Sequence, residues 1–400
     1  MSELYELPEG WEWKQLDDIS KLIGGGTPKR NMNEYWDNGN IVWLSPTDLG
    51  KIGDIIYISD SKDKITQQGL DKSSAKLLPV GTVLYSSRAT IGKIAINTIE
   101  VSTNQGFTNF ICNENLNNRY LAYILSRFTP EITSLSNSTT FKEVSKTSLK
   151  KFQIPLPPLQ EQKRIVAKLD TLFEKIDKAI ALHQKNMDEA DVLMGSVLNE
   201  VFGGMEEKYG KTQILSVMKI NNQTLIPDDD KMYNYIGLEN IESNSGKLVN
   251  YAPSIGKDIK SSKVNFKKGM VLYGKLRPYL NKVWIADFDG IATTEILPFL
   301  PIDNNLSMKY VKHYFLSPKY LAKVMSNCSG ARMPRLTTKF IKSNEAYIPV
   351  PSLNIQQKTV AYLDKISQKI EKLKAVQKEK MQSLVALKAS ILDQAFRGEL

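Results

Sequence analysis

The chain has few cysteines, few histidines and no long apolar run, and each shortage excludes a class of protein. Cys112 and Cys328 are the only cysteines among 400 residues, so we expect no disulfide framework and a reducing compartment. The first residues have neither a basic stretch nor an apolar core, which argues against a signal peptide. No apolar run is long enough to cross a bilayer. We therefore expect a soluble cytoplasmic protein that does not engage a membrane.

Motifs for catalysis are also missing. An adenine-N6 methyltransferase needs an Asn/Asp-Pro-Pro-Tyr/Phe loop, whereas Pro157-Pro158 lies between two leucines. The run Gly24-Gly25-Gly26 lacks the spacing and the Gly-Lys-Ser/Thr ending of a Walker A loop, so it indicates a turn or a close approach to a phosphate backbone. His183 and His313 are far apart in sequence, which argues against a metal cluster or a histidine-based triad. We expect His313 to pack or cap within its own helix.

Positive charge is in excess. The chain has 53 lysines and arginines against 43 acidic residues, a net charge of +10. Such an excess favours a polyanionic partner, most often a nucleic acid, although a merely basic soluble protein would have the same composition.

The most informative feature is an internal repeat. Ile154-Pro155-Leu156-Pro157-Pro158-Leu159-Gln160-Glu161-Gln162 is matched 194 residues later by Ile348-Pro349-Val350-Pro351-Ser352-Leu353-Asn354-Ile355-Gln356. The match continues without a gap, so that Leu169-Asp170 corresponds to Leu363-Asp364. A duplication of about half the chain predicts two similar modules that each end in the same long element.

The repeated element has the apolar periodicity of a long helix. Apolar residues recur at alternating steps of three and four, which is the seam of a coiled coil, with a stutter at His183. Gly203-Gly204 and Gly398 are the predicted stops. A long helix with one apolar stripe needs a partner, and the nearest one is the other copy, in a parallel or antiparallel pair. The residues predicted to pair are Leu169, Leu172, Ile176, Leu363, Ile366 and Ile370, with Leu373 further along the same predicted seam. His183 and Gln377 are polar residues at the same seam position, which more often fix register than perform chemistry.

The segments before each helix are predicted to be mixed α/β modules. Strand-like runs lie at 41–44, 55–58, 83–85, 94–96 and 110–112, and a helix is expected to carry Tyr120 to Phe128. In the second module, 269–273 resembles 81–85 and 282–285 resembles 93–96. The expected fold is α+β, with two mixed α/β modules joined by two long helices. Antiparallel pairing would make the helices a coiled coil and give the repeat an approximate two-fold axis. The predicted boundaries are 1–157, 158–204, 205–351 and 352–400.

These motifs together resemble the specificity subunit, HsdS, of type I restriction–modification systems. The resemblance rests on the opening Leu7-Pro8-Glu9-Gly10-Trp11-Glu12-Trp13, on the run Ile154 to Gln162, and on the ending Ala395 to Leu400. The segments Trp43 to Leu49 and Ser86 to Gly92 are similar to that family's recognition domains. Two departures are that the second module lacks a Trp-x-Trp opening, and that Ser352 and Ile355 stand where the first helix has Pro158 and Glu161.

The resemblance implies a chain without catalytic activity of its own. Each module would be a target recognition domain that reads half of a bipartite sequence in double-stranded DNA. The helices would set the spacing and bind two methyltransferase subunits that carry S-adenosylmethionine. Restriction subunits, with ATP and Mg²⁺, would complete the complex, and the chain itself would bind no cofactor and no metal.

Candidate DNA-contacting residues are the polar side chains of loops, because phosphates are held by Lys and Arg and bases are read mainly by Arg, Lys, Asn, Gln and Thr. In the first module they are Thr27, Lys29, Arg30, Ser45, Thr47, Ser87, Arg88, Asn104, Gln105, Thr139 and Lys142. In the second module they are Lys275, Arg277, Tyr279, Arg332 and Arg335. Arg88 and Arg277 carry the greatest weight because both follow the shared Val-Leu-Tyr strand. For each of them a solvated or paired surface side chain is an equally good interpretation.

Two other classes of function stay open at this stage. Pro227-Asp228 followed by Asp258-Ile259-Lys260 has the form of a degenerate metal-dependent nuclease pattern, although a solvated loop is the simpler interpretation. A scaffold that binds proteins through both modules would also use duplicated domains.

Overall fold

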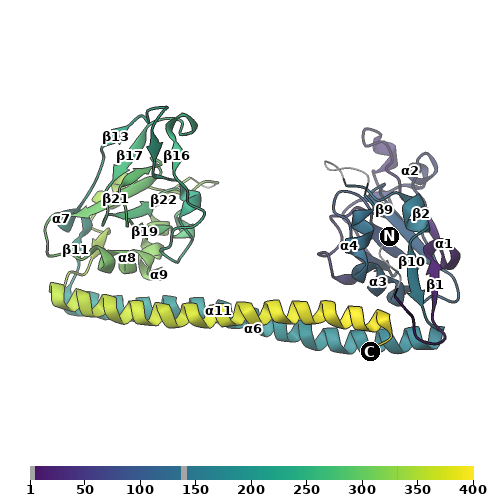
Figure 1. Cartoon of the computed structure of the whole chain (residues 1–400). Helices are drawn as coiled ribbons and strands as arrows, with labels where there is room; N and C mark the ends of the chain where they lie inside the picture. Colours follow the sequence, from purple (N-terminus) through teal and green to yellow (C-terminus); the bar gives the residue numbers. More distant parts are fainter. Residues whose placement is uncertain (1–4, 137–141, 331) are drawn as a thin grey trace. The chain divides into compact units, whose positions relative to one another are not determined.

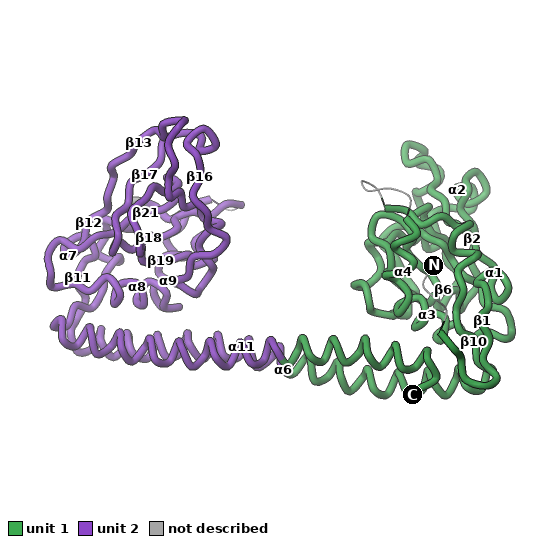
Figure 2. The backbone as a smooth tube through the Cα atoms, viewed as in Figure 1, with its two compact units in different colours: residues 1–182, 380–400 green, residues 183–379 purple. Residues whose placement is uncertain are grey.

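The computed structural model describes residues 5–136, 142–330 and 332–400. The chain divides into two compact units, one of residues 1–182 with 380–400 and one of residues 183–379 (Figure 2). The predicted α+β fold is confirmed, because each unit combines mixed sheets with part of both long helices (Figure 1). In the part of the chain that is described, no helix is long and apolar enough to cross a membrane.

The first unit is built on a five-stranded sheet in the order β2-β9-β6-β7-β4. All neighbours are antiparallel except β4 and β7, and the predicted strands of this module are confirmed. A three-stranded sheet β5-β3-β8 and the pair β1-β10 complete the unit. The strands are β1 (Glu12–Gln15), β2 (Ser20–Gly24), β3 (Ile41–Leu44), β4 (Ile55–Ile58), β5 (Lys64–Ile65), β6 (Val83–Ser86), β7 (Ile94–Asn97), β8 (Ser102–Thr103), β9 (Phe107–Cys112) and β10 (Gln153–Leu156).

The predicted helix of the first module is α3 (Asn118–Arg127), which starts at an Asn117 side chain that accepts hydrogen bonds from the backbone. Its apolar face is buried against β6 and β7 in the main core of this unit, to which α6 and the end of α11 also contribute. The smaller helices are α1 (Leu16–Ile19), α2 (Gln67–Asp71), α4 (Thr129–Ser134) and α5 (Lys146–Lys150), with a 3-10 turn η1 (Asn33–Tyr35).

The second unit repeats this plan with two four-stranded sheets, β12-β21-β18-β19 and β13-β17-β20-β15, and the pairs β11-β24, β14-β16 and β22-β23. Its helix α8 (Met308–Leu316) occupies the place of α3, and α9 (Pro318–Ser326) follows it. The other helices are α7 (Ile214–Val217) and α10 (Thr338–Lys342), with 3-10 turns η2 (Leu238–Asn240), η3 (Gly256–Asp258) and η4 (Pro278–Leu280). The strands are β11 (Thr212–Gln213), β12 (Met218–Ile220), β13 (Thr224–Leu225), β14 (Met232–Tyr233), β15 (Tyr235–Ile236), β16 (Ser254–Ile255), β17 (Lys263–Phe266), β18 (Val271–Gly274), β19 (Val283–Ile285), β20 (Gly290–Ala292), β21 (Ile296–Pro301), β22 (Cys328–Ser329), β23 (Arg335–Leu336) and β24 (Tyr347–Ile348).

The long helices are α6 (Leu159–Tyr209) and α11 (Leu353–Arg397). The predicted stop at Gly203-Gly204 is wrong, because α6 continues for another turn and ends before Gly210, whose φ of +71° is that of a glycine helix terminus. The buried Glu206 carboxylate explains the extra turn, since it pairs with Lys319 at 2.8 Å and Lys323 at 3.3 Å on α9. The predicted stop at Gly398 is confirmed, with a φ of +78°.

The helix seam follows most of the predicted positions. Leu169 and Ile176 are buried and Leu172 packs beside them in the first unit, while Leu363 is buried and Ile366 and Ile370 are half-buried in the second. Leu373, predicted to lie in the seam, is 45% exposed. The seam passes instead through the half-buried Lys374, because two consecutive steps of four shift the stripe.

The helices pair antiparallel within each unit. In the first unit Arg164 donates to the Leu400 carbonyl at 2.8 Å and Lys388 pairs with Asp177 at 2.8 Å, so α11 numbers fall as α6 numbers rise. In the second unit Lys374 pairs with Asp191 at 2.7 Å. His183 and Gln377, the polar residues at the same seam position of the two helices, are in contact in the second unit, with 2.5 Å between the His183 ring nitrogen Nδ1 and the Gln377 Oε1.

A fully buried glutamine ties each long helix to its module. The Gln162 Oε1 accepts the Asn117 N–H at 2.8 Å, and its Nε2 donates to the carbonyls of Asn115 and Pro157, both at 2.9 Å. Gln356 makes the same three contacts, with Ser307, Asn305 and Pro351. The repeated Gln of the Pro-x-Pro motif is therefore a structural anchor for the N-terminal turn of α3 or α8.

A second anchor lies two turns further along each helix. Asp170 pairs with Arg119 at 2.7 Å and accepts a hydrogen bond from the Tyr123 hydroxyl, and the corresponding Asp364 is 2.8 Å from the Nε2 of His313. His313 thus packs as expected, but its partner lies on α11 rather than within its own helix. Burial and the neighbouring Lys312 ammonium lower the pKa of His313 to about 4, although the Asp364 carboxylate acts in the opposite direction.

Replacing the buried glutamine should destabilise its unit. In Gln162→Leu, the Asn117 N–H and two carbonyls lose their partner inside the core, which we expect to lower the free energy of unfolding by about 3 kcal/mol. The exposed neighbour Gln160→Leu is the matched control and should change it by less than about 0.5 kcal/mol. Equal urea midpoints for the two variants would contradict the anchor.

The stability of the second unit should depend on pH through His313. The unfolded histidine takes up a proton near pH 6.5 while the folded one stays neutral to about pH 4, so the unfolding free energy should fall by about 2 to 3 kcal/mol as the pH falls through this window. His313→Tyr, which copies Tyr123 of the first unit, should keep a contact with Asp364 and lose this part of the pH dependence. Urea denaturation at pH 7 and pH 4.5 measures the difference, and parallel pH curves for the two proteins would contradict it.

Candidate nucleic-acid interface

The candidate residues of the first unit lie where several strands end together. Gly24 of β2 is opposite Thr108 of β9, Ser86 of β6 is opposite Phe107, and Leu44 of β3 lies beside Thr103 of β8. The loops after β2, β3 and β6 therefore meet the turn between β8 and β9. We call this loop cluster the first edge, and it consists of residues 25–30, 45–50, 87–93, 104–106 and 142–144.

The second unit has a corresponding cluster. Gly274 of β18 is opposite Ile296 of β21, and Ile236 of β15 lies beside Ala292 of β20. We call it the second edge, and it consists of residues 237–241, 275–282, 293–295 and 332–336. It holds all five second-module candidates, which are Lys275, Arg277, Tyr279, Arg332 and Arg335.

Backbone hydrogen bonds show which residues correspond. Ala89 donates to the Lys142 carbonyl as Arg277 donates to that of Pro334, at 2.9 and 2.8 Å. Both residues have positive φ, +60° and +50°. Arg88 and Arg277 are thus not counterparts, because Arg277 takes the place of Ala89. A non-glycine residue in this conformation is uncommon, so the turn imposes the same backbone strain in both units, and in the second unit its residue is the exposed Arg277.

The glycine run packs against the protein's own backbone. A Cβ at Gly25 would overlap the carbonyl oxygen of Asn104, and one at Gly26 would overlap the backbone nitrogen of Ala75. The expected approach to a phosphate backbone is therefore not needed to explain Gly25 and Gly26, since the fold itself leaves no room for a side chain there.

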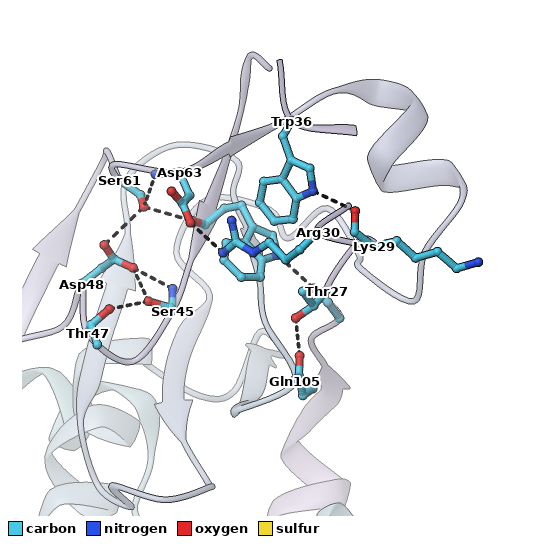
Figure 3. A network of polar contacts seen from close by, with 12 residues as sticks. Thr27, Lys29, Arg30, Trp36, Ser45, Thr47, Asp48, Ser61, Asp63 and Gln105 are labelled. Carbon is cyan, nitrogen blue, oxygen red and sulfur yellow. Dashed lines mark hydrogen bonds and ion pairs between the residues drawn. The ribbon is translucent and has the colours of Figure 1, made fainter. Parts of the chain in front are cut away.

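Arg30 is held in place by aromatic and acidic neighbours (Figure 3). Its guanidinium carbon lies 3.8 Å from the ring centroid of Trp36 and 4.8 Å from that of Trp43, and Asp63 pairs with it at 2.7 Å. Trp36 in turn donates to the Lys29 carbonyl at 3.1 Å. The Arg30 side chain stays 55% exposed, so these three neighbours orient the guanidinium without covering it.

Asp48 organises the loop after β3 (Figure 3). It accepts the Ser45 N–H at 2.7 Å and the Ser45 hydroxyl at 2.8 Å, and Ser61 donates to its other oxygen at 3.3 Å. The Ser45 hydroxyl also lies 2.6 Å from that of Thr47, which is exposed. The two hydroxyls that we expected to contact DNA are thus fixed side by side by a carboxylate that the sequence analysis missed.

Other candidates differ in how freely their polar atoms are presented. Thr27 donates to the exposed Gln105 (Figure 3). The Asn104 side chain instead accepts the Gly106 N–H at 2.8 Å and holds the turn. Ser87 is only 5% exposed and its hydroxyl accepts from Thr108 at 3.1 Å, so its proposed role in DNA contact is not supported by its position. The side chains of Lys29, Arg88 and Lys142 are exposed, and Thr139 lies outside the described residues.

Carboxylates also stand beside arginines elsewhere on the edges. Arg88 lies 3.5 Å from Glu143, and Arg335 pairs with Glu295 at 3.0 Å. Arg277, Tyr279 and Arg332 are exposed and Lys275 is half-buried. Each edge therefore combines cations with hydrogen-bonding groups in loops that rigid strands position, which suits contact with a polyanion better than with an apolar ligand.

The described residues offer no site for metal chemistry. No group of three or more His, Cys, Asp or Glu side chains among them is placed to hold a metal ion. Asp228 of the nuclease-like pattern pairs with Lys231 at 3.1 Å, as expected for a solvated loop.

Comparisons with known proteins agree with this duplicated arrangement. The profile of the family described as type I restriction modification DNA specificity domain matches residues 8–186 and again residues 206–380. The type I restriction enzyme MjaIX specificity subunit of Methanocaldococcus jannaschii is 34% identical over 189 residues, 46% of this chain and 43% of that protein. The EcoR124I/EcoR124II specificity subunit of Escherichia coli is 32% identical over 190 residues, 44% of this chain and 46% of that protein. The chain thus spans about half the length of these two relatives, whereas the Escherichia coli EcoDI specificity subunit is 23% identical over 99% of this chain and 90% of its own length.

Solved structures show the same fold at low identity. A chain from a structure concerned with complex assembly and conformational transition of the type I R-M system superposes with a TM-score of 0.74 at 22% identity, covering 99% of this chain and 100% of that one. The HsdS subunit from Thermoanaerobacter tengcongensis has a TM-score of 0.53 at 21% identity, covering 100% and 99%.

The specificity-domain profile covers most of the chain in two consecutive copies, and each copy contains one of the two loop edges. The chain therefore belongs to the type I restriction–modification DNA specificity family.

Proposed function

We propose that the chain is the DNA-reading specificity subunit of a type I restriction–modification complex, with each edge reading one half of a bipartite target in double-stranded DNA. The observation that carries this proposal is the duplication of the edge. The same strand ends and backbone hydrogen bonds recur in both units, while the side chains they present differ, as with Ala89 and Arg277. One scaffold with two sets of side chains suits recognition of two different half-sites.

The partners follow from the same proposal. Two methyltransferase subunits would bind along the helices and bring S-adenosylmethionine, and restriction subunits would bring ATP and Mg²⁺, all in the cytoplasm. Large apolar side chains that stay more than half exposed on the helices support contacts with protein partners, and they are Leu182, Val192, Leu193, Tyr362 and Val385. In this proposal the chain itself supplies recognition and spacing and no catalysis.

The two other classes of function have less support. A nuclease or methyltransferase would need a catalytic cluster, and the described residues carry neither a metal-binding group nor the adenine-binding loop. A protein-binding scaffold does not account for the cations on the edges. Incubation of the purified chain with labelled S-adenosylmethionine and DNA tests the enzyme alternative directly, and methyl transfer by the chain alone would establish it.

Exchange of residues 205–351 for those of a related protein should change one half of the recognised sequence and leave the other unchanged. The segment contains Glu206 together with its ion-pair partners Lys319 and Lys323, so these ion pairs are exchanged as a set. The related protein that supplies the segment must also provide a side chain that can hydrogen-bond to Asp364, which lies outside the exchanged residues. Methylation-aware sequencing of cells that carry the chimaera with its partner subunits reads both halves, and a simultaneous change in both would show that the modules are not independent readers.

Four residues inserted after His183 should lengthen the unspecified gap between the half-sites. The insertion adds about one helical turn, roughly 6 Å at ~1.5 Å per residue, which corresponds to one or two base pairs at ~3.4 Å each. The four-residue insertion nearly preserves which face of the helix is apolar. A two-residue insertion is the matched control, because it rotates the apolar seam of α6 away from α11. Methylation mapping measures the gap. An unchanged gap in an active four-residue variant would show that the helices do not set the spacing.

A further inference from the structure

Two lysines, one on each edge, use their ammonium groups to donate hydrogen bonds to backbone carbonyls of a neighbouring loop. Lys93 precedes β7, and its Nζ donates to the carbonyls of Pro46 at 2.8 Å and Leu49 at 3.3 Å. Lys282 precedes β19, and its Nζ donates to the carbonyl of Leu238 at 2.6 Å. Both side chains are partly buried, and burial lowers the pKa of Lys282.

The two lysines occupy the same place in the repeat. The Lys93 carbonyl accepts the Ser86 N–H and the Lys282 carbonyl accepts the Gly274 N–H, both at 2.9 Å. The carbonyls that the ammonium groups reach lie in the loops after β3 and β15, which are themselves equivalent parallel strands. A contact between a lysine ammonium and loop carbonyls is therefore present in both units, although most of the edge side chains differ between them.

The two loops have a second shared feature. The Ser45 N–H donates to the Asp48 side chain at 2.7 Å, and the Gly237 N–H donates to the Asn240 side chain at 2.9 Å. In each loop, an acidic or amide side chain of the loop itself accepts a backbone N–H, and a lysine from outside the loop donates to loop carbonyls. In the first unit this loop carries the Ser45 and Thr47 hydroxyls.

We propose that Lys93 and Lys282 are positioning residues for half-site recognition, which hold the loops 45–50 and 237–241 in the shape that reads DNA without contacting DNA themselves. The inference rests on the proposed function, since it assumes that the edges hold DNA. An ammonium that donates to carbonyls has fewer N–H groups left for a phosphate, and partial burial keeps it from the surface where a duplex would lie.

The competing role, direct phosphate contact, has a different salt signature. Loss of one phosphate contact reduces the slope of log affinity against log salt by about 0.9, with little effect on sequence preference. Loss of a positioning contact leaves the slope unchanged and weakens the preference for one half-site, because bases are read by the displaced loop.

The test uses the chain assembled with its methyltransferase subunits, and duplexes that carry the full target or a substitution in one half. Lys93→Met should lower affinity for the full target by about tenfold or more, relax preference only in the half read by the first unit, and keep the salt slope. Lys282→Met should do the same for the other half. Lys93→Arg should restore most of the affinity, since a guanidinium also donates to carbonyls.

Lys29→Met is the contrast variant, because Lys29 is exposed on the first edge. It should reduce the salt slope by about 0.9 and leave the preference for both halves unchanged. Melting temperatures of all variants are measured in parallel, so that a general loss of folding is recognised by an equal loss of both half-sites.

Three results would overturn the inference. These are a reduced salt slope with intact preference in Lys93→Met, an unchanged affinity, or an equal loss of both half-sites with a lower melting temperature that Lys93→Arg does not restore. If the unmodified complex shows no sequence preference at all, the proposed function fails instead, so the two failures are distinguishable.

Discussion

One buried amide side chain fixes where each long helix leaves its module. Gln162 and Gln356 each satisfy one N–H and two carbonyls, which come from two segments that meet in the core: the loop before α3 or α8 and the entry to the long helix. A buried amide with all these partners is stabilising, whereas any apolar replacement leaves several polar groups without water. The direction of the helix, and therefore the position of everything packed along it, depends on this contact.

The aspartates two turns later show how the repeat keeps a constraint and changes its chemistry. Asp170 holds an arginine and a tyrosine, whereas Asp364 holds a buried histidine. Both contacts stop the helix from rotating about its own axis while the module stays attached. The edges follow the same rule, since their backbone contacts are equivalent and their side chains are not.

Much of this fold could be predicted from the sequence, because its main signals are local or repeated. The strands at 83–86 and 94–97, the face of α3 and most of the seam follow from apolar periodicity. The end of α6 could not be predicted, because a glycine pair does not break a helix whose next turn is anchored by Glu206. The prediction that Leu373 lies in the seam was wrong because a stutter in α11 moves the apolar stripe by part of a turn. Lys374 takes the seam position instead, where it pairs with Asp191 on α6.

The sequence predicted which loops form the candidate interface, but it did not predict which neighbours each of their side chains contacts. Polar loop composition indicated the correct segments, but whether a side chain faces solvent depends on tertiary neighbours. Ser87 is buried and hydrogen-bonded to Thr108, and Arg30 is ordered by the nearby Trp36 together with Trp43 and Asp63 from later segments. Lys93 is a cation in one of these polar loops, as a DNA-binding residue would be. Only its contact with the Pro46 carbonyl shows that its charge is turned inward.

The division of the chain has a consequence for its synthesis. The second unit is one continuous segment, 183–379, whereas the first unit needs residues 380–400 to complete a core that contains Ile391, Ala395 and Phe396. The Tyr5 hydroxyl donates to the Phe396 carbonyl at 2.6 Å, so this contact of the first unit forms only after Phe396 has been synthesised. On the ribosome the second unit can fold as soon as residues 183–379 have emerged, whereas the first unit, although made earlier, cannot complete its core until residues 380–400 have also emerged. The unit synthesised first is therefore the last to finish folding.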